Sequence, residues 1–455
     1  MLNDTIAAIS TPVGEGGIGI VRLSGEQSLN MLKKVFVRKR EQDSIVPWHV
    51  YYGHIVDPVS KETIDEVLAV YMAAPNTYTR EDVVEISCHG GPVPLQSILG
   101  LVLRQGARLA HAGEFTLRAF INGRIDLAQA ESVLDVIRAK TQVGMQMAMN
   151  QLGGSLSREI KEARAQIINV IAYLTATIDF SEDEIPEEDI AAPLESAIRR
   201  TQGLLRNADA GIIYRQGLRT AIIGRPNVGK SSLLNALLRD NRAIVTPIPG
   251  TTRDTLEEVV NLRGIPVVLV DTAGITPTTD IAEQLGVERS RQAIGVADLV
   301  LLVVDGSEIL QQQDREIAAM VADRAKLVIV NKTDLAERIE IGELMEILGD
   351  TPVGRASAAT GHGLNEIEEA VVTTVMTGTV SASDALLVTN PRHKDALSRA
   401  LSHLEAAKES LETGMPADFI TIDLTAAAEA LGEITGETVT EDLLENIFSR
   451  FCIGK

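Results

Sequence analysis

The strongest chemical signal in the chain is a glycine-rich segment that ends in a lysine and a serine. It begins at Gly224, directly after the apolar run 220–223, and continues through Gly229, Lys230 and Ser231 into the helix-forming sequence SLLNALL. Glycines let successive backbone N–H groups converge on phosphate oxygens at a helix N-terminus. In such a loop the lysine reaches the β- and γ-phosphates, and the serine hydroxyl binds Mg²⁺. The segment predicts a nucleotide-binding phosphate loop.

A second phosphate motif stands further along the chain. Asp271, Thr272, Ala273 and Gly274 come directly after residues 267–270, which read as a buried strand. At this place a carboxylate stands behind Mg²⁺, and a glycine amide faces the γ-phosphate, where a switch segment can sense hydrolysis. The motif adds Asp271 and Gly274 to the candidate catalytic residues, beside the lysine of the phosphate loop.

Two short motifs predict which base the nucleotide carries. Asn331, Lys332 and Asp334 follow the apolar run 327–330. The Asp334 carboxylate can accept hydrogen bonds from both the N1–H and the exocyclic amine of guanine, an arrangement that adenine does not offer. The base pocket would be completed by Ser357, Ala358 and Ala359. The four motifs, in this order, predict a GTPase rather than an ATPase.

The residue after the second phosphate motif is not the catalytic glutamine of Ras-type GTPases. Ras-type GTPases place a glutamine there to orient the attacking water, whereas this chain has Ile275, which cannot make that hydrogen bond. Asp280 and Glu283 are downstream carboxylates that a switch loop could bring to the water. Arg253 is near enough in sequence to be considered as an arginine finger. A monovalent cation is the alternative source of positive charge.

Length, charge and cysteine content narrow the class of protein. A chain of 455 residues is long enough for two or three domains with separate cores. Its formal net charge of −21 repels nucleic acid except at a basic patch or through a basic partner.

No apolar run approaches the roughly 18 residues of a membrane span. Asp4, with no basic residue before it, does not suit a secretory signal. Because Cys88 and Cys452 are the only cysteines, we expect a cytoplasmic protein without a disulfide framework.

Two segments near the N-terminus imitate functional motifs. Gly14, Gly16 and Gly19 match a dinucleotide-binding fingerprint, but the residues after them read as a strand instead of a helix. Cys88 and His89 are neighbours on an expected strand, so their side chains point to opposite faces and do not form a metal site. We expect both segments to serve the fold.

The hydrophobic periodicity changes three times along the chain. Short β-like runs alternate with helices over residues 1–118, which predicts a small α/β domain. Apolar spacing of three and four residues over 119–214 predicts helices. Strands alternate with helices over 215–378, which predicts a parallel sheet, and helical periodicity resumes over 379–455. The expected fold is multidomain α/β plus all-α: an N-terminal α/β domain, then a helical domain interrupted by an inserted P-loop GTPase domain.

Longer segments outside the nucleotide motifs carry a family resemblance. They are EISCHGG at Glu85–Gly91, GEFTLRAFINGRIDLAQAE at Gly113–Glu131, IDFSEDEIPEED at 178–189 and GEITGETVTEDLLENIFSRFCIGK at Gly432–Lys455. Together with Asn227 in the phosphate loop, they resemble the MnmE (TrmE) family of tRNA-modification GTPases over essentially the whole chain.

The resemblance implies an architecture and partners. The N-terminal domain would bind folate and form a homodimer. With an FAD-dependent partner of the MnmG type, in a heterotetramer, members of this family add an aminomethyl or carboxymethylaminomethyl group at C5 of the wobble uridine of certain tRNAs. GTP hydrolysis would drive a conformational cycle during this modification. No membrane association is implied.

The resemblance also implies how the GTP site works. Thr252 would bind Mg²⁺ together with Ser231, and Glu283, preferred over Asp280, would orient the attacking water. A K⁺ ion, supported by dimerisation of the G domains, would take the place of an arginine finger. Its ligands would be Asn227, Thr246, Ile248 and Thr251. The predicted GTP contacts are Asn227, Val228, Gly229, Lys230, Ser231, Ser232, Thr246, Thr251, Thr252, Asp271, Thr272, Ala273, Gly274, Asn331, Lys332, Asp334, Ser357, Ala358 and Ala359.

A second ligand is implied for the N-terminal domain. Arg22, Glu85, Arg124 and Lys455 match the family's contacts to a tetrahydrofolate derivative, either 5-formyl- or 5,10-methylene-tetrahydrofolate. Basic groups suit the glutamate tail of a folate. Cys452 would lie beside the one-carbon donor, although taken alone it reads as a buried structural thiol.

A ribosome-assembly GTPase of the Era or Der type shares the nucleotide motifs and is the alternative. It would act as a binding switch without folate chemistry, and a KH-like RNA-binding tail would favour it. The sequences FCIGK and GEFTLRAF favour tRNA modification instead, and the acidic charge disfavours direct docking on ribosomal RNA. A membrane-surface GTPase would need a basic amphipathic helix, and none is evident.

Overall fold

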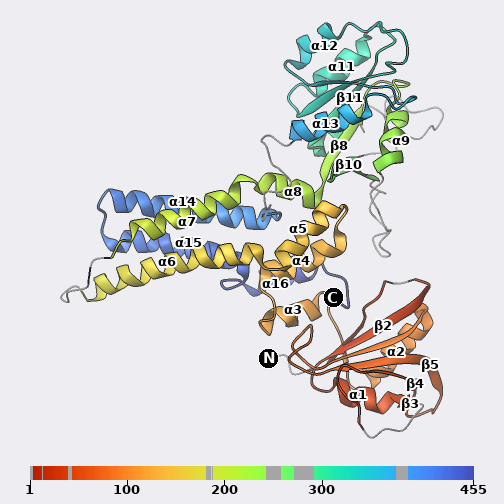
Figure 1. Ribbon diagram of the computed structural model, residues 1–455, viewed down its shortest axis with the longest axis vertical. Helices are drawn as coiled ribbons and strands as arrows, with labels where there is room; N and C mark the ends of the chain where they lie inside the picture. Colours follow the sequence, from red (N-terminus) through yellow and green to blue (C-terminus); the bar gives the residue numbers. More distant parts are fainter. Residues whose placement is uncertain are drawn as a thin grey trace. The chain divides into compact units, whose positions relative to one another are not determined.

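The chain divides into two compact units, each of which is described by itself. The computed structural model describes residues 4–12, 14–38, 44–180, 186, 188–241, 258–270, 292–375 and 388–455 (Figure 1). The first unit includes Met1–Leu134 and Glu429–Lys455. The second includes Asp135–Thr246 and Arg253–Ala428. The two ends of the chain therefore belong to the same unit.

A seven-stranded sheet forms the centre of the first unit. The strand order is β3-β4-β5-β6-β2-β1-β7. All neighbours are antiparallel except β1 and β7, which are parallel. The strands are β1 (Ile6–Ile9), β2 (Gly16–Ser24), β3 (Phe36–Arg38), β4 (Val50–Val56), β5 (Thr63–Met72), β6 (Val83–Gly90) and β7 (Arg108–Leu109). Because β2 begins within the glycine-rich segment, at Gly16, and no helix follows it directly, the interpretation of that segment as structural is confirmed.

Two helices pack against this sheet, α1 (Ser28–Val35) and α2 (Pro92–Arg104). Pro92 suits the first turn of α2 because a helix leaves its first N–H groups unpaired. Leu95, Ile98 and Leu101 recur at three-residue spacing and are buried against the strands. The sequence pattern therefore positions the helix as well as forming it.

The C-terminal segment docks onto the first unit. Ala112 forms an isolated β-bridge with Ile453, and the Ser10 hydroxyl donates to the Gly454 carbonyl at 3.2 Å. Gly454 has a φ of +94°, and a Cβ there would lie 2.3 Å from the Ile9 carbonyl oxygen. Only glycine fits this position. Helices α3 (Glu114–Ile121) and α16 (Glu441–Phe448) belong wholly to this unit, and α4 (Leu127–Arg138) and α15 (Ala417–Thr435) belong to it in part.

Helices from both sides of the GTPase segment pack together in the second unit. α7 packs against α6, which precedes it, and against α14, which follows the GTPase segment. Asn390 caps α14 by accepting a hydrogen bond from the Arg392 N–H, and Pro391 occupies its first turn. These helices are α5 (Gln142–Leu152), α6 (Ser155–Asp179), α7 (Ala191–Arg206), α8 (Ala208–Gln216), α14 (Pro391–Glu412) and α15 (Ala417–Thr435). The predicted interruption of a helical domain is confirmed.

The interrupting segment contains a six-stranded sheet in the order β13-β12-β11-β8-β10-β9. β11 is buried along its whole length, as expected for a central strand covered on both faces. The strands are β8 (Leu218–Ile223), β9 (Glu258–Leu262), β10 (Ile265–Val270), β11 (Leu299–Asp305), β12 (Lys326–Asn331) and β13 (Val353–Arg355). The helices described around it are α9 (Lys230–Asn241), α11 (Gln312–Met320), α12 (Ile341–Leu348) and α13 (Leu364–Val375).

One edge of this sheet departs from the parallel arrangement that the sequence predicts. β9 pairs with β10 in antiparallel register, with Leu262 opposite Ile265. The two residues between them, Arg263 and Gly264, have φ values of +49° and +94°. Two successive positive φ angles produce the tight hairpin turn that suits twisted strands. The hairpin adds an edge strand that the alternation of strands and helices did not reveal.

Candidate nucleotide-binding site

The order of strands in the GTPase sheet indicates where a ligand binds. After β8 the chain forms β9 and β10 on one side of it, with β10 adjacent, and then β11, β12 and β13 on the other side. In open α/β sheets, ligands bind at the carboxyl ends of the strands beside such a reversal. The loops that follow β8, β11 and β12 therefore form the candidate site.

The loop between β8 and α9 depends on its glycines for close packing. Gly224 and Gly229 have φ values of +152° and +94°, and between them Asn227 has a φ of +67°. A Cβ on Gly224 would lie 2.2 Å from the Val303 carbonyl oxygen, and one on Gly229 would lie 2.2 Å from Nδ2 of Asn331. Neither position accepts a side chain without movement. The loop amides are thus held at the N-terminus of α9, where a phosphate is favoured.

Lys230 folds back over this loop. Its Nζ donates to the carbonyl oxygens of Gly224 at 2.7 Å and Arg225 at 2.8 Å. Burial lowers the pKa of Lys230 because the charged form loses hydration. Carbonyl partners do not neutralise the ammonium charge, so the group keeps its attraction for phosphate oxygens. Ser231 and Ser232 follow it in the first turn of α9.

Asn331 joins three of the predicted motifs. Its side chain is almost completely buried, and Nδ2 donates to the Val228 carbonyl in the phosphate loop at 2.8 Å. Its Oδ1 accepts a hydrogen bond from the Ala358 N–H at 3.1 Å. One amide therefore links the phosphate loop to both segments of the predicted base pocket.

Asp334 and Ser357 lie together as the guanine interpretation requires. The Ser357 hydroxyl donates to Oδ1 of Asp334 at 2.6 Å and accepts from the Thr360 N–H at 3.2 Å. Asp334 is exposed, and Ala359 is also exposed in the loop after Ala358. The hydroxyl orients a carboxylate that faces solvent, which leaves its second oxygen for donors on a base.

Two ion-pair clusters beside the loops were missed by reasoning from sequence. Lys332 pairs with Asp305 at the end of β11, at 2.5 Å, and Arg225 of the phosphate loop pairs with Glu308 at 2.6 Å and Asp314 at 3.2 Å. An acid at the carboxyl end of an all-apolar strand was the available signal. Only the register of β11 against β12 shows that this acid meets the guanine motif.

Several predicted site residues lie outside the part of the chain that the structure describes. They are Thr246, Ile248, Thr251, Thr252, Asp271, Thr272, Ala273, Gly274 and Glu283. Their roles in binding K⁺, binding Mg²⁺ and orienting water stay predictions.

The predicted folate residues fall in the first unit, where strand pairing brings two of them together. Arg22 on β2 stands opposite Glu85 on β6, and their side chains form an ion pair at 2.8 Å. Nη1 of Arg22 also lies 3.4 Å from the Gly454 carbonyl oxygen, next to Lys455. The Arg22 guanidinium lies 5.7 Å from the ring centre of Phe115. Two of the four predicted contacts, Arg22 and Glu85, are therefore paired, and a third, Lys455, follows the residue whose carbonyl Arg22 approaches.

The fourth predicted contact, Arg124, packs against an aromatic side chain. The exposed Arg124 guanidinium lies 4.7 Å from the ring centre of Tyr78, whose hydroxyl is 3.0 Å from that of Thr116. Cys452 is exposed, so its interpretation as a buried thiol is wrong. Docking of the C-terminal segment by the Ile453 bridge leaves this side chain on the surface.

Two residues of the GEFTLRAF segment, Glu114 and Arg118, belong to a buried ionic cluster in the first unit. Arg118 is 1% exposed and pairs with Glu114 at 3.0 Å, Asp4 at 2.7 Å and Glu81 at 3.2 Å. Arg108 pairs with Glu114 at 2.5 Å and Asp4 at 2.6 Å. Burial alone would raise the pKa of Glu114, but hydrogen bonds from Arg108 and other donors hold it below its ordinary value. The cluster ties the first strand region to α3.

The CHGG segment has the structural role that its position on a strand predicts. Cys88 is buried and donates to the Gly19 carbonyl, whereas His89 points outward and pairs with Asp65 at 2.6 Å. A Cβ on Gly90 would lie 2.4 Å from the Gly16 carbonyl oxygen. This glycine therefore allows β6 to approach β2.

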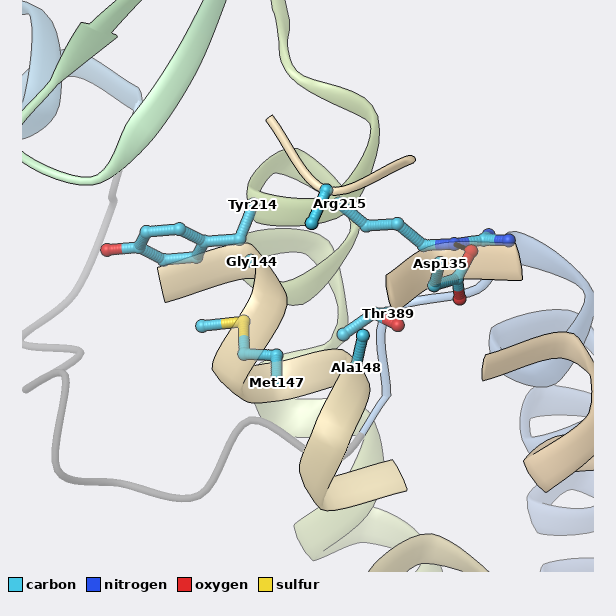
Figure 2. Close-up of a pocket in the computed structure, with 8 residues that line it drawn as sticks. Asp135, Gly144, Met147, Ala148, Tyr214, Arg215 and Thr389 are labelled. Atoms are coloured by element: carbon cyan, nitrogen blue, oxygen red, sulfur yellow. Dashed lines mark hydrogen bonds and ion pairs between the residues drawn. The ribbon is translucent and has the colours of Figure 1, made fainter. Parts of the chain in front are cut away.

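A small cavity lies between α4, α5, α8 and the start of α14 (Figure 2). Its volume is about 10 Å³, which is room for roughly one water molecule. Arg215 and Asp135 meet at its wall in an ion pair of 2.7 Å. The cavity is too small for a substrate, so we read it as part of the packing between these helices. Among the described helices, none combines the length and apolar character needed to cross a membrane.

Comparison with known proteins matches nearly the whole chain to one family. The profile described as MnmE helical domain matches residues 127–452, and that described as GTP-binding protein TrmE N-terminus matches residues 5–124. The chain is 51% identical to the tRNA modification GTPase MnmE of Alkaliphilus metalliredigens and 53% identical to that of Chloroflexus aurantiacus. Both matches cover 100% of each chain.

Solved structures that resemble the chain cover a smaller part of it. The G domain of the FeoB iron transporter from T. maritima is 28% identical, covers 35% of this chain and 99% of that one, and has a TM-score of 0.26. Era from Aquifex aeolicus is 26% identical, covers 41% of this chain and 66% of that one, and has a TM-score of 0.26.

Proposed function

The chain belongs to the MnmE family of tRNA modification GTPases, and we propose that it is the GTP-hydrolysing subunit of a wobble-uridine modification complex. The product would carry an aminomethyl or carboxymethylaminomethyl group at C5 of the uridine. The observation that carries the proposal is identity of about half of all residues to MnmE proteins over their full length. The nucleotide loops described above support the GTPase part independently.

The proposed complex contains a homodimer of this chain, an FAD-dependent partner of the MnmG type and tRNA. Because the chain carries a net charge of −21, much of the grip on tRNA would have to come from the partner. The domain division proposed from the sequence is 1–118, 119–214, 215–378 and 379–455. It assigns dimerisation and folate binding to the first of these segments.

GTP would be held with Mg²⁺ on Ser231 and Thr252, and with K⁺ on Asn227, Thr246, Ile248 and Thr251. The exposure of Asn227 in the phosphate loop supports this, because its amide oxygen is accessible to a cation. K⁺ would supply positive charge where the chain has no evident arginine finger. Glu283 would orient the attacking water.

A tetrahydrofolate derivative would bind where the two ends of the chain meet. Arg22, exposed Arg124 and Lys455 offer cations to the glutamate tail, and Glu85 offers a carboxylate to polar N–H groups of the ring. The donor set therefore fits a folate. When bound, the folate would supply the one-carbon unit, and Cys452 would stand at the surface of the same region.

Two measurements test the proposal. Unmodified tRNA would be incubated with the chain, its FAD-dependent partner, GTP and a one-carbon folate, and the wobble nucleoside identified by mass spectrometry. We expect modification only when GTP is hydrolysed. A chain that hydrolyses GTP but leaves uridine unchanged, and instead associates with ribosomal subunits, would favour an assembly GTPase.

The second measurement is steady-state GTP hydrolysis in KCl and in NaCl at equal ionic strength, with G-domain association followed in parallel. We expect K⁺-selective stimulation together with dimerisation. Equal slow rates in both salts would exclude Asn227 as a potassium ligand. In the Glu283→Ala variant we expect slower turnover with nucleotide affinity nearly intact, whereas loss of binding would make Glu283 structural.

A further inference from the structure

An acidic residue outside the recognised motifs contacts the lysine of the guanine motif. β11 and β12 are parallel neighbours, and their register places Asp305 beside Asn331, one residue before Lys332. Oδ2 of Asp305 lies 2.5 Å from Nζ of Lys332. The Asp305 side chain is 3% exposed and that of Lys332 is 33% exposed. The pair therefore has a buried acid and a lysine that reaches toward solvent.

Asp305 has the additional hydrogen bonds that a buried carboxylate needs. Its second oxygen, Oδ1, accepts from the Ser307 N–H at 2.9 Å and from the Ser307 hydroxyl at 2.6 Å. A buried ion pair lowers the free energy of the folded state only when its remaining lone pairs are satisfied in this way. Burial alone would raise the pKa of Asp305, but Lys332 and Ser307 hold it below its ordinary value. The carboxylate is therefore charged and fixed.

The backbone of Lys332 is also held in an uncommon conformation. Its φ is +63°, in the left-handed region that side chains other than glycine rarely adopt. Hydrogen bonds on either side hold this turn: the Gly306 N–H donates to the Asn331 carbonyl at 2.8 Å and the Thr333 N–H to the Ala356 carbonyl at 3.2 Å. From this turn the lysine side chain reaches the carboxylate of Asp305.

The segment that follows Asp305 also contacts the phosphate loop. Arg225, between Gly224 and the exposed part of the loop, donates to Glu308 at 2.6 Å and pairs with Asp314 at 3.2 Å. Residues 305–314 thus provide three carboxylates, one for the guanine motif and two for the phosphate loop. The same segment connects both halves of the nucleotide site.

We infer that Asp305 is a positioning residue for guanine-nucleotide binding. It draws the Lys332 ammonium group to the end of β11, so that the methylene stem of the lysine lies along the base pocket. The inference rests on the GTP site described above and assigns to it a residue that touches neither nucleotide nor metal. Loss of the carboxylate should weaken nucleotide binding and leave the chemical step intact.

The test is Asp305→Asn, which keeps the shape of the side chain and removes its charge. We expect the Kd for GTP and GDP, and the KM for GTP, to rise about tenfold, which corresponds to about 1.4 kcal/mol. The kcat at saturating GTP should stay within about twofold. The matched control is Ser307→Ala, which removes only the hydroxyl bond to Oδ1. It keeps the backbone N–H bond to the same oxygen and does not touch Lys332, so KM should change less than twofold. A fall in kcat with unchanged KM would overturn the inference.

A double-mutant cycle separates positioning from a general structural role. In a Lys332→Met background, which keeps an apolar stem but has no charge, adding Asp305→Asn should weaken GTP binding no further. An equal loss in both backgrounds would show that Asp305 acts through something other than Lys332. If Asp305→Asn does not fold, Asp305→Glu replaces it: a KM raised severalfold supports positioning, and an unchanged KM contradicts it.

Asp334→Asn, measured in parallel, distinguishes failure of the site from failure of the inference. If it does not shift base preference toward xanthosine nucleotides, the pocket assignment itself is wrong. If it does shift base preference while Asp305→Asn leaves nucleotide binding unchanged, only the role of Asp305 is rejected.

Discussion

The nucleotide site and the site at the chain ends are built in opposite ways. The phosphate loop, Asp305 and the guanine motif each lie at the carboxyl end of a strand in the parallel part of one sheet, so short segments in sequence order come together. At the chain ends, Arg22 meets a carbonyl that lies 432 residues further along the chain. The first site depends on local backbone geometry, and the second depends on docking of the C-terminal segment.

This difference predicts how each site fails. A change in a nucleotide loop should affect GTP alone, because the loops rest on an apolar sheet whose central strands are almost completely buried. A change under the C-terminal segment should affect the site at the chain ends alone. The buried ionic cluster beneath that site should in addition make the first unit sensitive to acid.

The largest effect is expected at the base pocket. In Asp334→Asn the carboxylate that accepts from guanine becomes an amide, so GTP binding should fall on the order of 10⁴-fold, because unpaired polar groups remain in the pocket. Xanthosine triphosphate should become the preferred substrate. Competition binding with both nucleotides measures this, and Asp350→Asn, on an exposed loop of the same sheet, is the control. An unchanged base preference would contradict the assignment of the guanine pocket.

The buried ionic cluster should show the next largest effect, on stability. Glu114→Gln removes a charge from beside the almost completely buried Arg118 and should lower the unfolding free energy of the first unit by about 3–5 kcal/mol. Glu195→Gln, which breaks exposed pairs with Arg199 and Lys408, should cost at most about 1 kcal/mol. Denaturant titration of both variants measures the difference. Equal small losses would mean that the cluster does not stabilise the fold.

The same cluster gives a pH dependence with a defined sign. The pKa values of Glu114 and Asp4 are lower in the folded chain than their ordinary values of 4.5 and 3.8. Their contribution is therefore fully present above those ordinary values and is lost as the pH falls through the lower folded values. Acid unfolding of the first unit should begin below about pH 4.5, and Glu114→Gln should flatten this dependence.

A moderate effect is expected where the C-terminal segment docks. Gly454→Val places a side chain against the Ile9 carbonyl in a left-handed backbone, so folate affinity should fall about tenfold or more while GTP hydrolysis is unchanged. Gly414→Val is the control, because its φ of +69° is similar but nothing lies within 4 Å of its Cβ position. Isothermal titration with 5-formyl-tetrahydrofolate reports the difference. Loss of GTP hydrolysis would contradict the independence of the two sites.

The smallest expected effect is a difference in thiol reactivity between the two cysteines. Burial raises the pKa of the Cys88 thiol to about 11, so almost none of it is thiolate at pH 8, whereas Cys452 is exposed. Iodoacetamide should label Cys452 and leave Cys88 unmodified until the protein is unfolded, as peptide mass spectrometry would show. Bound folate should slow labelling of Cys452 if the two share a site. Rapid labelling of Cys88 in the folded protein would contradict its burial.

The sequence alone predicted the phosphate loop and the guanine motif that the structure brings together, because glycine and lysine positions in such loops obey local backbone rules. The order of the parallel strands then brings these loops together at one edge of the sheet. Reasoning from sequence did not identify Asp305 or Arg225 as parts of the site, since their partners are set by strand register and loop packing. The β9–β10 hairpin was missed because two residues form its turn and its strands read as one apolar stretch.

Composition, motif order and periodicity thus determined the fold class, the nucleotide and the division of the helical domain, because each rests on interactions between residues close in sequence. Tertiary structure alone decided that Cys452 is exposed, that Arg22 approaches the Gly454 carbonyl and that Asp305 is the carboxylate that pairs with Lys332. These contacts join residues from separate strands and from opposite ends of the chain. Their geometry exists only after the sheets have formed and the C-terminal segment has docked.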